Sequence, residues 1–217
     1  MTRLLGALGC LLLAVVLGGG SGWATGPSLL FTIASMQALW GVGACLTGAV
    51  VGGRSWRRGA VAGGLFGLVA MVGYYVAVTL DFGWYIARMR LIDHGGEFWI
   101  TAAVIGGALM GANGVVFTRW PTGRLLDPSA MAHAVVAGVL GCEALFVLVQ
   151  LDRFAYWQQL REVGIGLVAL AAVIGVRALL RSGLRSTVIA FGIAAACAPA
   201  AAGLFFVIEH RYGYVTV

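Results

Sequence analysis

The sequence predicts an all-α protein, a polytopic bundle of transmembrane helices. Apolar residues make up 61% of the 217 residues and charged residues only 10%, and the mean hydropathy is +0.97. These values lie far outside the range of soluble domains. The chain also holds several charge-free runs of about twenty residues, the length that a helix needs to cross a bilayer. The short alternating segments of a transmembrane barrel are absent from the sequence.

Apolar runs separated by short connections define the expected spans. They are residues 4–20, 28–52, 59–80, 98–118, 130–150, 163–180 and 187–208. Because no connection is long enough for a soluble domain, we expect one integral membrane domain over residues 1–217. The run 163–180 reaches span length only if Arg177 extends its side chain to the interface. The connection 81–94 is expected to form a short amphipathic segment on the membrane surface.

The first run also has the form of a signal peptide. A single Arg precedes the apolar stretch, and small residues follow it around Gly22, Trp23 and Ala24. In a multi-pass protein we expect this segment to be retained as a signal anchor. Cleavage is the alternative, and it would leave six spans with the same orientation.

Arginines supply the expected orientation, since every basic residue of the chain is Arg. In the seven-span arrangement nine of them fall on one side: Arg3, Arg54, Arg57, Arg58, Arg119, Arg124, Arg177, Arg181 and Arg185. Five fall on the other side: Arg88, Arg90, Arg153, Arg161 and Arg211. The positive-inside rule therefore predicts a cytoplasmic N-terminus and an external C-terminus. The use of Arg alone, with abundant Ala, Gly and Val, favours a bacterial cytoplasmic membrane.

Two segments of the chain resemble each other. Residues 60–71 of the third span and 134–145 of the fifth match in size and polarity, except that Glu143 replaces Val69. An acid followed by aromatic residues closes both spans, and a looser copy closes the seventh. We interpret spans two to seven as three hairpin repeats to which the first helix is added. Similar composition of Ala/Gly/Val-rich helices is the alternative explanation.

Small residues recur at every fourth position in four spans. They are Ala44, Gly48 and Gly52; Gly59, Gly63 and Gly67; Gly107 and Gly111; and Ala134, Gly138 and Cys142. In lipid, close backbone approach and van der Waals contact hold helices together, so each stripe predicts a helix contact face. The contact could lie within the chain, with a second copy or with another membrane protein.

Glu143 is the only acid or base deep inside an apolar run. Such a residue costs several kcal/mol to insert and is a functional candidate by default. Counting along the helices puts Gln37, Tyr74 and Pro199 at a similar depth, so these four residues define a candidate midplane site for a substrate or a proton. The alternative is structural: a neutral Glu that hydrogen-bonds across helices.

The remaining polar residues suggest simpler roles. Asn113 is expected to hydrogen-bond between helices, and His133 to be a helix-end residue. His94 and Glu97 could offer two metal ligands, but the glycines between them are typical of an ordinary turn, so no metal site and no cofactor are expected.

Arginine clusters at the expected cytoplasmic ends could contact anionic lipid head groups. The residues are Arg54, Arg57, Arg58, Arg181 and Arg185, with Arg177 beside the last two. They lie at membrane boundaries, so the lipid bilayer is the expected partner and nucleic-acid binding is not indicated.

The chain contains none of the familiar catalytic or nucleotide-binding motifs, and no enzyme is expected. Through residues 58–75 and the Gly-rich residues 106–118, it resembles small multi-pass bacterial membrane proteins of unassigned function. That resemblance implies a membrane location and no catalytic residues. Two functions remain: a small carrier or permease subunit with a site at Glu143, or a non-transporting scaffold or regulatory subunit of another membrane protein.

Overall fold

The computed structural model describes residues 2–23, 37–92, 96–119, 127–149 and 157–212, which are helical and contain no strand. The helices are α1 (Thr2–Gly22), α3 (Gln37–Val51), α4 (Trp56–Phe82), α5 (Trp84–Ile92), α6 (Gly96–Arg119), α7 (Pro128–Val149) and α8 (Trp157–Tyr212). Five helices of this part are long and apolar enough to cross a membrane, and α3 is a shorter apolar helix. The predicted all-α class is confirmed.

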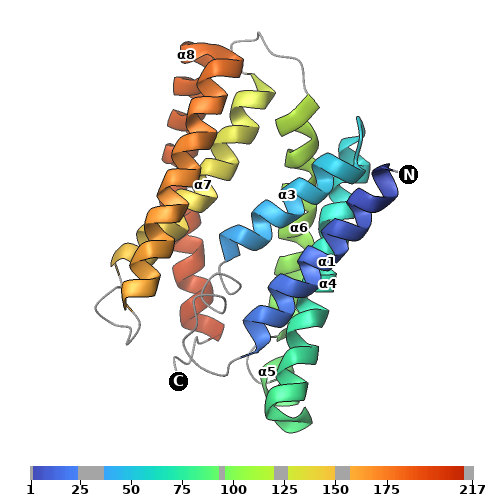
Figure 1. Cartoon of the computed structure of the whole chain (residues 1–217). Coiled ribbons are helices and arrows are strands. Elements are labelled where there is room, and N and C mark those ends of the chain that lie inside the picture. The colour runs from blue at the N-terminus through green and yellow to red at the C-terminus, as the bar shows by residue number, and fades with distance from the viewer. Residues whose placement is uncertain (1, 24–36, 93–95, 120–126, 150–156, 213–217) are drawn as a thin grey trace.

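Gly183 divides α8 into two arms. Its φ of 79° and ψ of 163° are not helical, and a positive φ of this size is readily adopted only by glycine. The two arms lie side by side in Figure 1, so the chain reverses direction at this residue. The predicted spans 163–180 and 187–208 correspond to these arms.

The predicted spans 4–20, 59–80, 98–118 and 130–150 fall on α1, α4, α6 and α7. The second predicted span is described only from Gln37 onward, as α3, and residues 28–36 lie outside the described part. The helix α5 occupies most of the connection in which a short surface segment was expected.

Local signals set the ends of α4. The Ser55 side chain accepts the backbone N–H of Arg58 at the start of the helix (3.4 Å), as N-cap residues do. At the other end, Gly83 has a φ of 84°, and its N–H donates to the carbonyl of Thr79 at 3.0 Å. This positive φ lets the chain leave α4 and begin α5 after a single residue.

The helices form two groups. In one, α4 packs extensively on α1, α3 and α6, and in the other α7 packs on α8 (Figure 1). Among the described residues, far fewer contacts join the groups, and they run mainly from α7 to α3 and α6. An apolar cluster fills this seam; its buried members are Ala38, Cys45, Val136, Ala137, Leu140, Ala144, Val163, Leu167 and Ile174.

Glycines bring α3, α4 and α6 into backbone contact. A Cβ on Gly63 would overlap the carbonyl oxygen of Gly107, and one on Gly48 would overlap that of Gly111. Because side chains are absent at these points, the backbones approach closely enough for extensive van der Waals contact. The predicted small-residue contact faces on these three helices are confirmed.

On α7, only the first member of the predicted stripe makes a described contact within the chain. Ala134 is fully buried against Ala130 and Ala190. By contrast, a Cβ on Gly138 would meet nothing within 4 Å among the described residues, and Cys142 is exposed. Val136 and Leu140 of α7 belong to the apolar cluster that also contains residues of α3 and α8.

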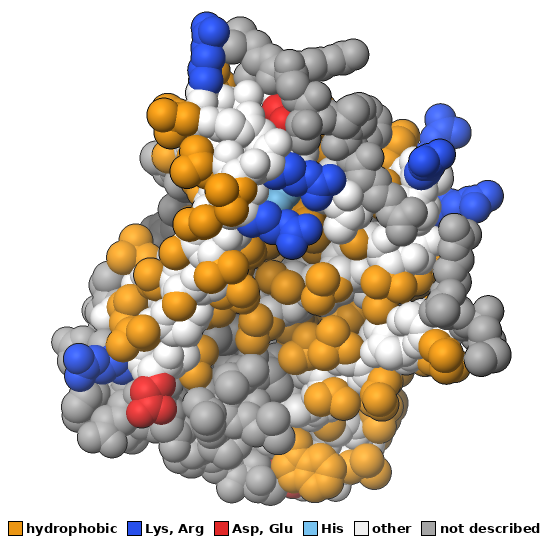
Figure 2. Space-filling model, turned by 45° about the horizontal axis from the view of Figure 1, so that its top comes forward, with side chains coloured by type: hydrophobic (Ala, Val, Ile, Leu, Met, Phe, Trp, Pro, Cys, Tyr) orange, Lys and Arg blue, Asp and Glu red, His pale blue; other side chains and the backbone are white. Residues whose placement is uncertain are grey.

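Large apolar side chains cover the outside of the bundle. Leu12, Leu65, Leu109 and Val173 are each more than half exposed, and Figure 2 shows hydrophobic side chains over the middle of the molecule. Lys/Arg side chains gather mainly towards one end of that view. This distribution matches helices that face lipid along their length and water at their ends.

Candidate functional site

Glu143 lies where the two helix groups meet. Its carboxylate on α7 accepts a hydrogen bond from the backbone N–H of Ala38, in the first turn of α3. Glu143 comes 15 residues after the start of α7 at Pro128 and 6 before its end at Val149. At about 1.5 Å per residue, it is roughly 22 Å from one end of the helix and 9 Å from the other. The contact therefore lies well inside the apolar part of the bundle.

The N-terminus of α3 is a favourable partner for this carboxylate. The first N–H groups of a helix lack intrahelical acceptors, and the helix dipole places about half a positive charge there. Figure 1 shows α3 running from the middle of the bundle to the end where α4 begins. The 15 described residues of α3 span about 22 Å, so Ala38 lies roughly 20 Å from the end of α3 that leads into α4.

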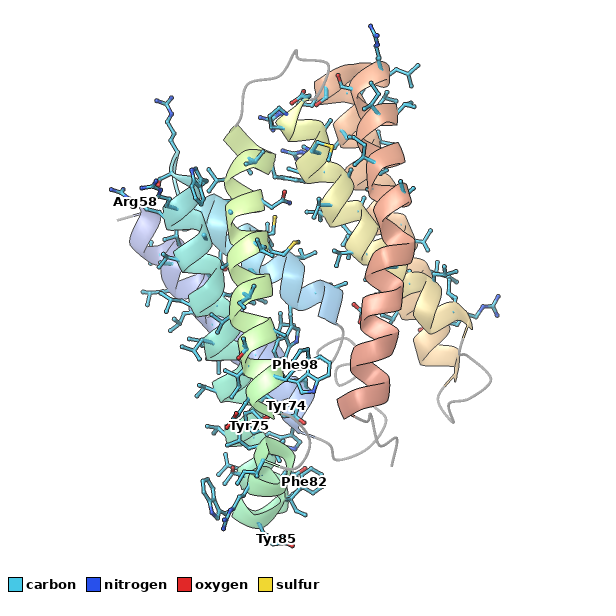
Figure 3. The ribbon with its side chains drawn as sticks, turned by 180° about the vertical axis from the view of Figure 1, so that it is seen from behind. Arg58, Tyr74, Tyr75, Phe82, Tyr85 and Phe98 are labelled. Carbon is cyan, nitrogen blue, oxygen red and sulfur yellow. The ribbon has the colours of Figure 1, made fainter. Side chains whose placement is uncertain are left out.

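The other residues of the predicted midplane site are placed as follows. Gln37 is the first residue of α3, so its backbone neighbours the Glu143 contact, but its side chain lies outside the described part. Tyr74 is on α4 with its ring against Tyr75 (5.2 Å between centroids), towards the end opposite Arg58 (Figure 3). Pro199 is in the second arm of α8, and its side chain is likewise outside the description.

Asn113 is a second polar residue of the seam. Its Nδ2 donates to the carbonyl of Ala132 on α7 at 3.1 Å. The predicted interhelical hydrogen bond is confirmed. Asn113 therefore joins α6 to α7 at the boundary between the two groups.

His133 forms the centre of a buried polar cluster at the beginning of α7. The side chain is fully buried, its Nδ1 lies 2.6 Å from the carbonyl of Ser129, and its ring stacks on Phe117 of α6 with centroids 3.9 Å apart. Asp127 precedes α7, and its Oδ1 accepts the N–H of Ser129 at 2.8 Å. His133 is a helix-end residue as expected, but its burial between helices was not foreseen. The order Asp127, Pro128, Ser129 is a typical helix-start signal that could have located the cluster.

Two arginines of α8 complete this cluster. Arg181 donates to the carbonyls of Phe117 (3.3 Å) and Thr118 (2.9 Å) in the last turn of α6, an interaction that stabilises the negative end of that helix. The guanidinium of Arg177 lies 5.6 Å from the centre of the Phe117 ring, a cation–π contact, and its side chain is exposed.

The remaining predicted lipid-contact arginines are exposed. Arg54, Arg57 and Arg58 lie at the α3–α4 connection, where Arg57 stands over the Trp56 ring at 5.5 Å. Arg185 follows the turn of α8 and is exposed. These side chains are free to reach lipid head groups.

Of the two weak metal candidates, His94 lies outside the described part and Glu97 is an exposed residue in the first turn of α6. Among the described residues, no three His, Cys, Asp or Glu side chains come together as a metal site would require.

An apolar hollow of about 430 Å³ lies at the other end of the molecule, between α4, α5 and α6. Six of the residues that line it are Leu68, Met71, Val72, Tyr75, Thr79 and Leu91. A wall of this composition offers van der Waals contact and few hydrogen bonds, so it suits an acyl chain better than a polar substrate.

Long apolar helices whose large apolar side chains are exposed define this chain as a helical membrane protein. Over residues 1–210 it matches the family model DUF6518, described as a family of unknown function, and it belongs to that family. No curated protein and no solved structure matches the chain.

Proposed function

We propose that the protein is a small carrier or permease subunit of a bacterial cytoplasmic membrane, with Glu143 as its coupling group. The observation that carries this proposal is the contact between the Glu143 carboxylate and the first turn of α3. It joins a protonatable acid at membrane depth to a helix end across the seam between two helix groups. We propose a non-enzymatic role, in which binding and conformational change do the work.

The packing supports relative movement of the two groups. Helices α1, α3, α4 and α6 are locked together by backbone contacts at glycines, and α7 packs extensively on α8. The seam has far fewer contacts. Alternating access in many carriers is a rocking of one rigid bundle against another around a site near the midplane, and the thin seam is where such motion would occur.

The charge on Glu143 would control this motion. An ionised carboxylate attracts the positive end of α3, with a free energy of about 0.3–1 kcal/mol at exposed sites and up to about 2 kcal/mol when partly buried. A bound proton or cation neutralises the carboxylate and removes that attraction. Since about 1.4 kcal/mol changes an equilibrium constant tenfold, this would shift the balance between two arrangements of the seam.

Orientation is part of the proposal. The nine-to-five arginine asymmetry supports a cytoplasmic N-terminus, an external C-terminus and seven membrane passes. In Figure 1 the α3–α4 connection, the start of α7 and the turn of α8 lie at the same end as the N-terminus, and this would be the cytoplasmic end.

A non-transporting scaffold or regulatory subunit is the second candidate. It is favoured by the open glycines of α7, since Gly138 and Gly141 have nothing within 4 Å of a built Cβ among the described residues. A bare glycine surface allows a helix of another chain to approach closely. One partner recovered in fixed proportion after detergent extraction would favour this function.

A distance measurement across the seam tests the carrier proposal. Spin labels at Leu65 on α4 and Val176 on α8, both exposed, would be placed in a cysteine-free variant reconstituted in lipid. We expect two distances whose populations change between alkaline and mildly acidic buffer. Glu143→Gln should abolish the change, and Glu97→Gln should preserve it because Glu97 is exposed at a helix end. A single distance under all conditions, or a response that persists in Glu143→Gln, would contradict the mechanism.

A further inference from the structure

Several polar side-chain atoms of the α6–α7–α8 junction are buried and have no hydrogen-bond partner among the residues that the structure describes. They are Asp127 Oδ2, Ser129 Oγ, His133 Nε2, Ser182 Oγ and Thr187 Oγ1. Buried polar groups are hydrogen-bonded in the great majority of cases, and an unpaired one costs about 1–3 kcal/mol. Such a concentration at one junction indicates that a polar ligand completes it. We call Asp127, Ser129, His133, Arg177 and Arg181 the junction cluster.

The charges of the junction cluster favour an anion. Arg177 and Arg181 are four residues apart on α8, so they lie on one face of the helix. Both arginines, and Asp127 with its opposite charge, are close enough to the His133 ring to interact with it electrostatically. Figure 2 shows Lys/Arg and His side chains gathered at this end of the surface. Two adjacent guanidinium groups repel each other, and an anion between them would relieve that repulsion.

Both arginines of the junction cluster have N–H groups that could still bind a ligand. Arg181 uses two of its five N–H groups on the α6 carbonyls. Arg177 is exposed and makes a cation–π contact, which leaves its hydrogens available. His133 turns Nδ1 towards the Ser129 carbonyl, so Nδ1 carries the proton of the neutral ring, and Nε2 on the far side can accept a hydrogen bond from a hydroxyl group.

The Asp127 carboxylate indicates that the ligand must also carry a hydrogen-bond donor. Its Oδ1 accepts the Ser129 N–H, whereas Oδ2 is buried and has no donor in the described part of the chain. A carboxylate oxygen repels a bare anion, but it accepts readily from a hydroxyl group. The ligand that satisfies both ends of the cluster therefore carries a phosphate and a nearby hydroxyl.

We infer that the junction cluster is a binding site for a hydroxyl-bearing phosphate ester, such as a glycerol phosphate group. The phosphate would lie against Arg177 and Arg181, and the hydroxyl against Asp127 and His133 Nε2. A phosphate ester of this kind could be the head group of a lipid or a soluble molecule. The site is independent of Glu143 and of the carrier proposal.

Binding to the purified full-length protein in detergent tests this inference. The probes are short-chain phosphatidylglycerol, short-chain phosphatidylcholine, glycerol 3-phosphate and inorganic phosphate, with bound ligand counted by native mass spectrometry. We expect phosphatidylglycerol to bind about tenfold more tightly than phosphatidylcholine, the ratio for a difference of one charge-assisted contact. Displacement of the lipid by glycerol 3-phosphate would assign the site to the soluble ester, and retention would assign it to the head group.

Matched variants separate a built site from general surface charge. Arg177→Gln should weaken phosphatidylglycerol binding about tenfold, because it removes one charged contact. Arg185→Gln is the control: it removes an exposed arginine from the same helix and should leave the affinity within about twofold. His133→Gln should weaken binding and retain the helical circular dichroism spectrum. Equal losses for Arg177→Gln and Arg185→Gln, or equal affinity for the two lipids, would overturn the inference.

Discussion

The carboxylate of Glu143 accepts the backbone N–H of Ala38, which lies 105 residues earlier in the chain. This hydrogen bond connects α7 to the first turn of α3 across the seam of the bundle. It supplies the partner that an acid at this depth requires, although no Arg lies within the same apolar runs. Both a coupling role and a tethering role depend on this geometry, so the first prediction concerns its strength.

Removing the carboxylate should destabilise the protein. Glu143→Ala leaves the Ala38 N–H without an acceptor, and we expect a loss of about 1–3 kcal/mol in the free energy of unfolding. Glu143→Gln retains an acceptor oxygen and loses only the charge, so its cost should be smaller, about 0.5–1 kcal/mol. Reversible unfolding in mixed micelles measures both values. Equal stability of Glu143→Ala and wild type would show that the hydrogen bond does not form.

Glycine substitutions should separate the tight contact from the open face. Gly63→Ala places a methyl group against the Gly107 carbonyl, and overpacking of this kind costs about 1–3 kcal/mol. Gly138→Ala meets open space and should stabilise α7 by about 0.5–1 kcal/mol through its helix propensity. Thermal unfolding of the two variants in one detergent compares them. Similar midpoints for both would contradict the close approach of α4 and α6.

The last turn of α6 should depend on Arg181. Arg181→Gln removes two charged hydrogen bonds to the carbonyls of Phe117 and Thr118, so we expect fraying of that turn. Hydrogen exchange followed by mass spectrometry should show faster exchange in residues 115–119 and little change in α4. Arg185→Gln, which changes an exposed side chain beyond the turn, should leave exchange in α6 unaltered.

The proposed orientation can be measured by cysteine labelling. In a cysteine-free background, Tyr85→Cys on α5 and Leu184→Cys beside the α8 turn are both at highly exposed positions. An impermeant maleimide should label position 85 in intact cells and position 184 only after permeabilisation. The reverse pattern would place the N-terminus outside and would contradict the arginine-based orientation.

Hydrophobicity and glycine spacing predicted much of the architecture. Apolar runs marked α1, α4, α6 and α7 as spans because a helix in lipid must be long and apolar over its whole length. Glycines at every fourth position predicted contact faces on α4 and α6, because close approach requires missing side chains, and the structure shows that these two faces meet. The three-hairpin repeat remains a prediction.

Hydrogen-bond partners that belong to the backbone could not be predicted from the sequence. Glu143 accepts from a backbone N–H, and every residue except proline has such a group, so the sequence does not show which one it meets. The burial of His133 against Phe117 depends on how α6 packs against α7. The open surface at Gly138 depends on which face α7 turns towards α8.

By itself, the sequence determined that this protein is a helical membrane protein with its arginines at helix ends, because transfer of a residue into lipid depends mainly on its own chemistry. Only the tertiary structure decided which polar groups meet. Glu143 faces the first turn of α3, and the cationic side chains of α8 surround a buried histidine. Helix rotation and crossing angle set these contacts, and they result from packing over whole helix faces rather than from any one residue.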